Sequence, residues 1–113
     1  GGSSGQNYDS ASIKSAEDAL FSAGLNQNIM IDCSHANSNK NPENQLEVVK
    51  DVIKQLSEGN RSIIGLMVES NIAYGNQKLT SDLDSLLYGV SITDACINWQ
   101  STEALCMHLH ENL

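Results

Sequence analysis

Three residues whose side chains bind divalent metals follow apolar segments of the sequence. His35 comes after the run 28–33, Glu69 ends the run 62–68, and Asp94 lies further on in a polar turn sequence. A neutral imidazole and two carboxylates suit Mn²⁺, Fe²⁺ or Zn²⁺. Each residue also has an ordinary alternative, which is a loop or cap for His35, a solvated strand end for Glu69 and a turn for Asp94. Together the three residues predict a metal site.

Other metal-binding residue types offer weaker signals. Cys33 stands two positions before His35, so both would point the same way from an extended strand and could form a ligand pair. A small buried thiol is the more common role for such a cysteine. The remaining cysteines, Cys96 and Cys106, are expected in the core. His108 and His110 stand two apart on a predicted helix, hence on different faces, which disfavours a metal pair.

The cationic residues and the glycine-rich start give little evidence of a phosphate loop. Residues 1–5 lack both the Walker lysine and the G-x-G-x-x-G spacing. Lys40 and Lys78 fall in predicted loops from which they could reach a ligand. The other lysines occupy solvated helix positions: Lys14, Lys50 and Lys54.

The elements that must position these side chains alternate between helix and strand. Periodicity and capping residues predict helices over 10–23 and 42–58 and a third from about Ser101, with strands over 28–33 and 62–68 and a loop over 70–90. The strands are continuously apolar, which is typical of a parallel sheet covered on both faces. Such sheets place their sites at the carboxyl ends of the strands. Because two strands do not make a stable sheet alone, the pattern predicts part of a larger α/β barrel or doubly wound fold.

Charge and composition narrow the classes of partner. The 113 residues include 6 Lys and Arg against 14 Asp and Glu, a net charge of -8, and no basic residue follows Lys78. This balance argues against nucleic acid or an anionic membrane as a partner. The 40% of hydrophobic residues suffices for a core. Three cysteines without zinc or disulfide spacing fit a reduced, cytoplasmic location.

Three ordered blocks resemble one enzyme family. Residues 31–40 read Ile-Asp-Cys-Ser-His-Ala-Asn-Ser-Asn-Lys, which resembles the D-x-S-H-[AG]-N-S-x-K signature of class I 3-deoxy-7-phosphoheptulonate (DAHP) synthases. The block 65–70 together with Gly75-Asn76-Gln77, and the block 88–97, agree in the same order, and Asn7-Tyr8 also fits. The chain looks like the short microbial type that has no added regulatory domain.

This resemblance implies a (β/α)₈ barrel. Residues 1–113 would form the C-terminal portion of its single domain, from the sixth helix to the eighth, with two parallel strands and three helices. The N-terminal two-thirds would be absent. Gly1-Gly2 would match the end of the family's Leu-Arg-Gly-Gly strand.

The resemblance also implies a reaction and a ligand set. The family condenses phosphoenolpyruvate with erythrose 4-phosphate, giving 3-deoxy-D-arabino-heptulosonate 7-phosphate and phosphate, as the first step of the shikimate pathway. Its divalent metal (Mn²⁺, Fe²⁺, Zn²⁺ or Co²⁺) is held by a cysteine, a histidine, a glutamate and an aspartate. The last three fall on His35, Glu69 and Asp94, which are thereby both metal-binding and catalytic. The metal cysteine lies far upstream, so Cys33 does not take its role.

The same resemblance suggests substrate contacts for His35, Asp94 and Lys40, and a homodimer or tetramer for the full-length chain. Three positions depart from the family pattern without removing a matched ligand. Cys33 replaces an aromatic residue, Tyr74 a residue that is often acidic, and Asn98 a glycine. Because nearly all phosphate-binding Lys and Arg residues of the family lie upstream, we expect the 113-residue chain alone to be inactive.

Two other functions remain open on the sequence. The chain could be a small acidic α/β binding module without catalytic activity, such as a receiver-like domain. A receiver would need a lysine at the end of a late strand, and no such lysine is present. The chain could also be a structural piece in which the site residues are only remnants.

Overall fold

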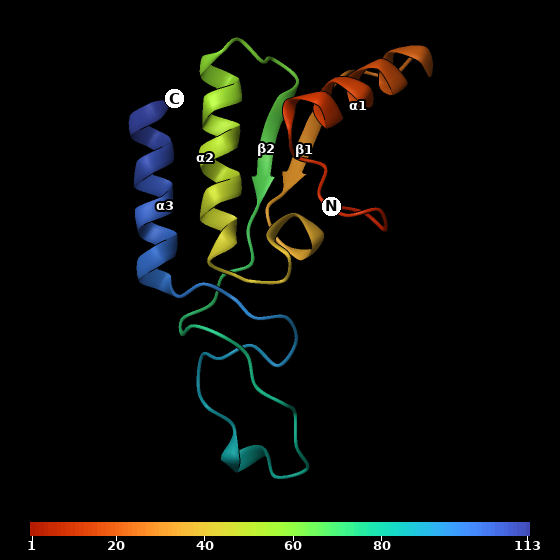
Figure 1. The fold of residues 1–113 in the computed structure, drawn as a ribbon. Coiled ribbons are helices and arrows are strands. Elements are labelled where there is room, and N and C mark those ends of the chain that lie inside the picture. Colours follow the sequence, from red (N-terminus) through yellow and green to blue (C-terminus); the bar gives the residue numbers. More distant parts are fainter.

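Two short parallel strands lie at the centre of the molecule, between helices (Figure 1). The structure is a computed structural model that describes residues 1–113. Its elements, in chain order, are α1 (Ser10–Ser22), β1 (Ile29–Asp32), the 3₁₀ helix η1 (His35–Ser38), α2 (Asn44–Ser57), β2 (Ile63–Met67), the 3₁₀ helix η2 (Leu83–Ser85) and α3 (Trp99–Asn112). The predicted set of three helices and two strands is confirmed.

The two strands pair in parallel, as predicted. Ile29 lies opposite Ile63, and Asp32 lies opposite Met67, with one irregularity after Ile29. Beyond the last pair, the Cys33 amide donates to the Met67 carbonyl at 2.9 Å. The polar residues that follow each strand therefore leave the sheet at the same edge.

Helix α2 supplies three of the nine buried residues of the core cluster, more than any other element, through one face. Val48, Val49 and Val52 are at most 1% exposed and pack in one cluster with Ile31 and Ile63 of the strands. The helical spacing of Leu46, Val49, Ile53 and Leu56 in the sequence predicts a buried stripe at these positions. The observed stripe is rotated and runs through 45, 48, 49, 52 and 55, while Leu46, Ile53 and Leu56 pack at its margin. The rotation places two glutamines on the buried face.

The outer helices begin at polar caps. The Asp9 side chain accepts a hydrogen bond from the Ser12 amide at the start of α1, and Gly24 follows its end with a left-handed φ of 71°. Helix α3 starts at Trp99, two residues before the predicted start, because the Asn98 side chain caps it by accepting from the Ser101 amide. Asn98, one of the departures from the family pattern, is thus a helix cap.

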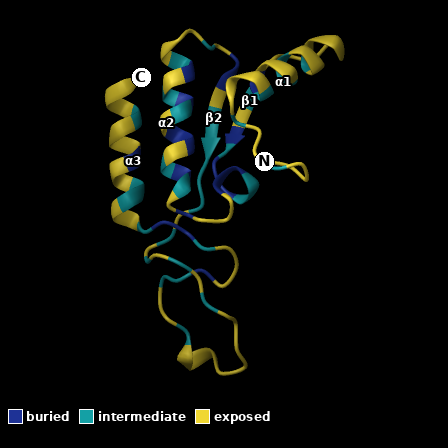
Figure 2. Ribbon diagram, viewed as in Figure 1, coloured by how far each residue is buried: buried dark blue, intermediate teal, exposed yellow.

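Part of the apolar surface of the sheet has no cover within these residues. Met30 and Ile64 are 66% and 65% exposed, although both belong to strands. Figure 2 shows the buried residues concentrated on α2, β1 and η1, whereas the long loop between β2 and α3 is largely exposed. No helix combines the length and apolar composition that a membrane crossing requires.

Candidate metal centre

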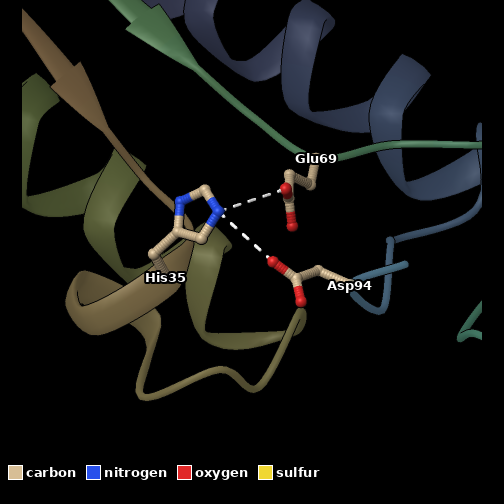
Figure 3. Close-up of side chains that lie close together, drawn as sticks. All are labelled: His35, Glu69 and Asp94. Atoms are coloured by element: carbon tan, nitrogen blue, oxygen red, sulfur yellow. Dashed lines mark ion pairs between the residues drawn. The ribbon is translucent and has the colours of Figure 1, made fainter.

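His35, Glu69 and Asp94 meet beyond the carboxyl ends of the two strands (Figure 3). The Nε2 atom of His35 lies 3.4 Å from Glu69 Oε1 and 3.3 Å from Asp94 Oδ2. One ligand atom from each residue lies within 4.8 Å of the other two. The structure therefore brings together the three residues that the sequence predicts as metal ligands.

The orientation of His35 is fixed by Asp32, the last residue of β1. His35 Nδ1 lies 2.9 Å from Asp32 Oδ2, and the other Asp32 oxygen accepts from the Ser34 amide at 2.8 Å. With Nδ1 bound to this carboxylate, Nε2 faces Glu69 and Asp94. A carboxylate on the second ring nitrogen is the usual way in which a metal-binding histidine is oriented.

The backbone of the loop 34–40 is held in an unusual conformation. His35, Asn39 and Lys40 have φ angles of 47°, 54° and 59°, in the left-handed region that L-residues with side chains avoid. Buried Asn37 supports the loop, since its amide donates to the Asp32 carbonyl and its oxygen accepts from the Asn7 amide, both at 2.8 Å. The rest of the loop thus compensates for the backbone conformation that His35 requires.

The chain before α1 fits closely against the same loop. A Cβ atom on Gly1 would lie 2.4 Å from the Cβ of Ala36 and 2.7 Å from the Asn37 amide nitrogen. Only glycine allows this approach without a shift of the backbone. The glycine at position 1 therefore has a structural role here.

Glu69 is held through both its side chain and its backbone. The Ser34 hydroxyl donates to Glu69 Oε2 at 2.9 Å, which leaves Oε1 facing His35. The Glu69 amide donates to the side-chain oxygen of Gln45 at 2.7 Å, and the Gln45 amide donates to the Glu69 carbonyl at 3.0 Å. Gln45 has no exposed surface.

Asp94 comes from the long loop and is the most exposed of the three, with 60% of its side chain accessible. The segment that carries it is tied to the end of β2, because the Ile97 amide donates to the Glu69 carbonyl at 3.1 Å. The Asn76 side chain supports it from within the loop by donating to the Thr93 carbonyl at 2.9 Å. Asn76 is the central residue of the sequence block Gly75-Asn76-Gln77.

Electrostatics favour the protonated imidazole when no cation is bound. The hydrogen bond and charge of Asp32 raise the pKa of His35 above its ordinary value of 6.5, and the carboxylates of Glu69 and Asp94 raise it further. The proton that His35 carries on Nε2 therefore faces two carboxylates. A divalent cation would take the position of that proton.

The residues present fit a divalent metal. Atoms bound to one ion at about 2.1 Å each lie roughly 3.0–3.4 Å apart, which matches the His35–Glu69 and His35–Asp94 distances of 3.4 and 3.3 Å. One imidazole nitrogen with two carboxylate oxygens suits Mn²⁺, Fe²⁺, Zn²⁺ or Co²⁺ and leaves positions for further ligands. The fit rests on the donor atoms and on the Asp32 contact that leaves Nε2 free.

A cavity of about 280 Å³ adjoins the three residues, and Lys40 lines it together with Ser34, Asn76 and Ala95. Lysines 14, 50 and 54 each form an ion pair with a neighbouring acid on their own helix or at its end, whereas Lys40 forms none. The Lys40 ammonium is therefore available to an anion in the cavity.

The cysteines lie outside the cluster of ligands. Cys33 is fully buried in the core, and burial, followed by the charge of Asp32, raises the pKa of its thiol to about 12. Cys33 is thus the small buried thiol that the sequence favoured over a Cys33–His35 ligand pair. The chain turns into η1 after the strand, and Cys33 takes no part in the cluster of His35, Glu69 and Asp94. Cys96 is buried as predicted, but Cys106 is exposed on α3, which corrects its assignment to the core.

Comparison with known proteins agrees with the geometry. The model of the DAHP synthetase I family matches residues 1–107. The chain belongs to this family. DAHP synthetase I family membership confirms the resemblance drawn from the three sequence blocks, and the match includes all three candidate ligands.

Relatives within the DAHP synthetase I family are similar over almost the whole chain. The Tyr-sensitive phospho-2-dehydro-3-deoxyheptonate aldolase of Escherichia coli (strain K12) is 46% identical over 112 residues, which are 99% of this chain and 32% of the relative. The phenylalanine-inhibited aldolase of Saccharomyces cerevisiae is 44% identical, covering 100% of this chain and 32% of the relative. The chain thus spans about a third of the length of these relatives.

A solved structure from the same family has the same fold. The phospho-2-dehydro-3-deoxyheptonate aldolase from Francisella tularensis SCHU S4 matches 99% of this chain with a TM-score of 0.91 and 36% sequence identity. The match covers 32% of that chain. The two strands and three helices described here therefore correspond to a piece of a DAHP synthase structure.

Gln45 is the site residue that sequence reasoning missed. The available signal was its spacing, because Gln45 and Gln55 fall at i and i+10 on the same face of α2 as Val48 and Val52. A buried amide on an apolar helix face needs polar partners. The backbone of Glu69 provides them for Gln45.

The first prediction concerns Asp32→Asn. The Ser34 amide retains the side-chain oxygen, so the new NH₂ group faces His35 Nδ1, which must then accept and leave the ring proton on Nε2. We expect the pKa of His35 to fall from its raised value toward the ordinary one, and Mn²⁺ affinity to fall about 10- to 100-fold. Nuclear magnetic resonance titration of the imidazole and Mn²⁺ binding measure the two effects.

The imidazoles of His108 and His110 on α3 are internal references whose resonances should not change with this substitution. A His35 titration midpoint that is the same in both proteins would contradict the role given to Asp32.

Proposed function

We propose that this chain contributes the metal-binding part of the active site of a DAHP synthase. This enzyme condenses phosphoenolpyruvate with erythrose 4-phosphate. The observation that carries the proposal is the convergence of His35, Glu69 and Asp94 beyond the ends of two parallel strands. Family membership supports the same activity. The names of the relatives, phospho-2-dehydro-3-deoxyheptonate aldolases, describe this reaction in the direction of cleavage.

The working enzyme, on this proposal, is a longer chain that forms a (β/α)₈ barrel. Residues 1–113 would be its C-terminal portion, from the sixth helix to the eighth. The exposed strand residues Met30 and Ile64 support this view, since apolar strand surface of this kind is normally covered. Assembly into a dimer or tetramer and a cytoplasmic location stay predictions.

In the proposed reaction all three residues bind the metal, and Asp94 has a second task. Bound at this site, a divalent metal supplies Lewis-acid polarisation of the aldehyde carbonyl of erythrose 4-phosphate. Asp32 orients the imidazole of His35, and Ser34 orients the carboxylate of Glu69. Asp94 is exposed enough to accept a hydrogen bond from a sugar hydroxyl as well as to bind the cation.

Lys40 supplies the positive charge for an anionic substrate at the cavity. Two carboxylate ligands balance a divalent cation, so the charge that remains at the cavity is that of Lys40. The left-handed backbone at Lys40 is a conformation that glycine adopts more easily. A lysine at this position indicates that the side chain has a role that offsets the backbone cost.

The second prediction tests the metal site directly. His35→Ala removes the only nitrogen ligand of the cluster, so we expect Mn²⁺ affinity to fall at least about 100-fold, as measured by titration calorimetry. His110→Ala, on the exposed face of α3, is the matched control and should bind like the wild type. Unchanged affinity in His35→Ala would favour the binding module or the structural piece without a working site.

The third prediction is that the isolated 113-residue chain releases no phosphate from the two substrates. Both substrates are phosphorylated, but three of its lysines are engaged in ion pairs. Arg61 lies at the opposite ends of the strands. Lys78 is exposed in the long loop and does not line the cavity, so Lys40 is the cation at the site. A phosphate-release assay with saturating Mn²⁺ measures this, with the full-length protein as positive control. Robust turnover by the isolated chain would overturn it.

The fourth prediction separates stability from binding at Lys40 in the full-length protein. Lys40→Gly relieves the left-handed backbone, so we expect about 1 kcal/mol of added stability in thermal unfolding. We also expect KM for an anionic substrate to rise about tenfold through loss of a charged contact. Lys40→Ala removes the charge but keeps the strain, so it should raise KM equally without the gain in stability. A wild-type KM in both variants would rule out the role of Lys40.

A further inference from the structure

We propose that Gln45 is a positioning residue for the metal centre, acting through the backbone of Glu69. This inference rests on the proposed metal-binding function of Glu69. Gln45 belongs to the first turn of α2 and touches neither the cavity nor the other two ligands through the contacts described above. Its effect is therefore on the placement of a ligand.

The two hydrogen bonds between the Gln45 side chain and the Glu69 backbone resemble those that a neighbouring strand would make. Strand β2 ends at Met67, and the last sheet bond runs from the Cys33 amide to the Met67 carbonyl. Glu69 lies two residues beyond this point, so β1 gives its amide and carbonyl no partners. The Gln45 side chain replaces the absent strand by accepting from the Glu69 amide at 2.7 Å and donating to its carbonyl at 3.0 Å.

The hydrogen bonds of Glu69 connect it to both chain segments that carry the other two candidate ligands. The Glu69 carbonyl that accepts from Gln45 also accepts from the Ile97 amide at 3.1 Å, three residues after Asp94. The Glu69 carboxylate accepts from Ser34, next to His35. Movement of the Glu69 backbone would therefore shift its own carboxylate and loosen the segment that carries Asp94.

Packing alone does not account for a glutamine at this position. The residue is fully buried on a face whose other buried residues are three valines and one further glutamine, Gln55. An apolar side chain at this position would avoid the cost of burying an amide. Gln55, on the same face, provides the comparison. Its buried amide donates to the Tyr8 carbonyl at 2.7 Å and to Asp51 at 2.6 Å, and it makes no contact with a ligand.

The fifth prediction compares Gln45→Met with Gln55→Met in the full-length protein. Both substitutions keep the side-chain length and remove buried hydrogen bonds, so both should lower the unfolding midpoint to a similar extent. Only Gln45→Met should weaken Mn²⁺ binding, by about 10- to 100-fold, and change the visible absorption spectrum of the Co²⁺-loaded protein. Gln55→Met should bind Mn²⁺ within about twofold of the wild type and keep its Co²⁺ spectrum.

The following results would overturn the positioning role of Gln45 or the proposed function. Wild-type Mn²⁺ affinity and an unchanged Co²⁺ spectrum in Gln45→Met would overturn the positioning role, and so would equal losses of affinity in both variants. If Gln45→Met does not fold, Gln45→Glu is used, because it keeps the side-chain length and an acceptor for the Glu69 amide while it replaces the NH₂ donor with a carboxyl oxygen. If neither folds while Gln55→Met does, Gln45 is a structural residue and the inference is wrong. Absence of Mn²⁺ binding by the wild type would instead contradict the proposed function.

Discussion

The parallel pairing of β1 with β2 is the constraint on which the candidate site depends. Its register places Asp32 opposite Met67, so the chain segments that carry His35 and Glu69 leave the sheet side by side. A slip of one residue would exchange the two faces of a strand and move the segment that carries His35 away from Glu69. The three valines of α2 oppose such a slip, because they pack against strand residues that must face the helix, Ile31 and Ile63.

The strained backbone at His35, just after the end of β1, positions the imidazole of this residue. The left-handed conformation of His35 turns the chain sharply after β1, so its imidazole returns over the strand end, within 2.9 Å of Asp32. A residue with a side chain adopts this conformation at a cost of about 1–2 kcal/mol. The buried hydrogen bonds of Asn37 to Asp32 and Asn7 help to offset that cost. The signature block 31–40 is therefore mostly a scaffold for one imidazole.

The sequence predicted the order of elements, the parallel pairing and the gathering of His35, Glu69 and Asp94 at one site, because apolar runs, caps and strand-end residues are local features. It did not predict the rotation of α2, because Leu46 and Val49 fit a buried stripe as well as Gln45 and Val49 do. The contact between Gln45 and Glu69 joins residues 24 positions apart and follows from packing alone. The divergence of Cys33 from His35 depends on backbone angles that β-strand alternation does not reveal.

The same Asp32 contact affects proton and metal in opposite ways, and this sets how the site would respond to pH. By stabilising positive charge on the imidazole, Asp32 raises the pKa of His35, so a proton occupies Nε2 over a wider pH range. It also makes Nε2 a stronger donor to a metal once that proton has left. Because the raised pKa lies above 6.5, the proton competes with a cation until the pH exceeds the folded-state pKa.

In the metal-free protein the charge on His35 adds stability below pH 6.5 that is lost as the pH rises through the folded-state pKa. The imidazolium then holds Glu69 and Asp94 together where they would otherwise repel each other. A divalent cation in the same place would likewise hold these two carboxylates together.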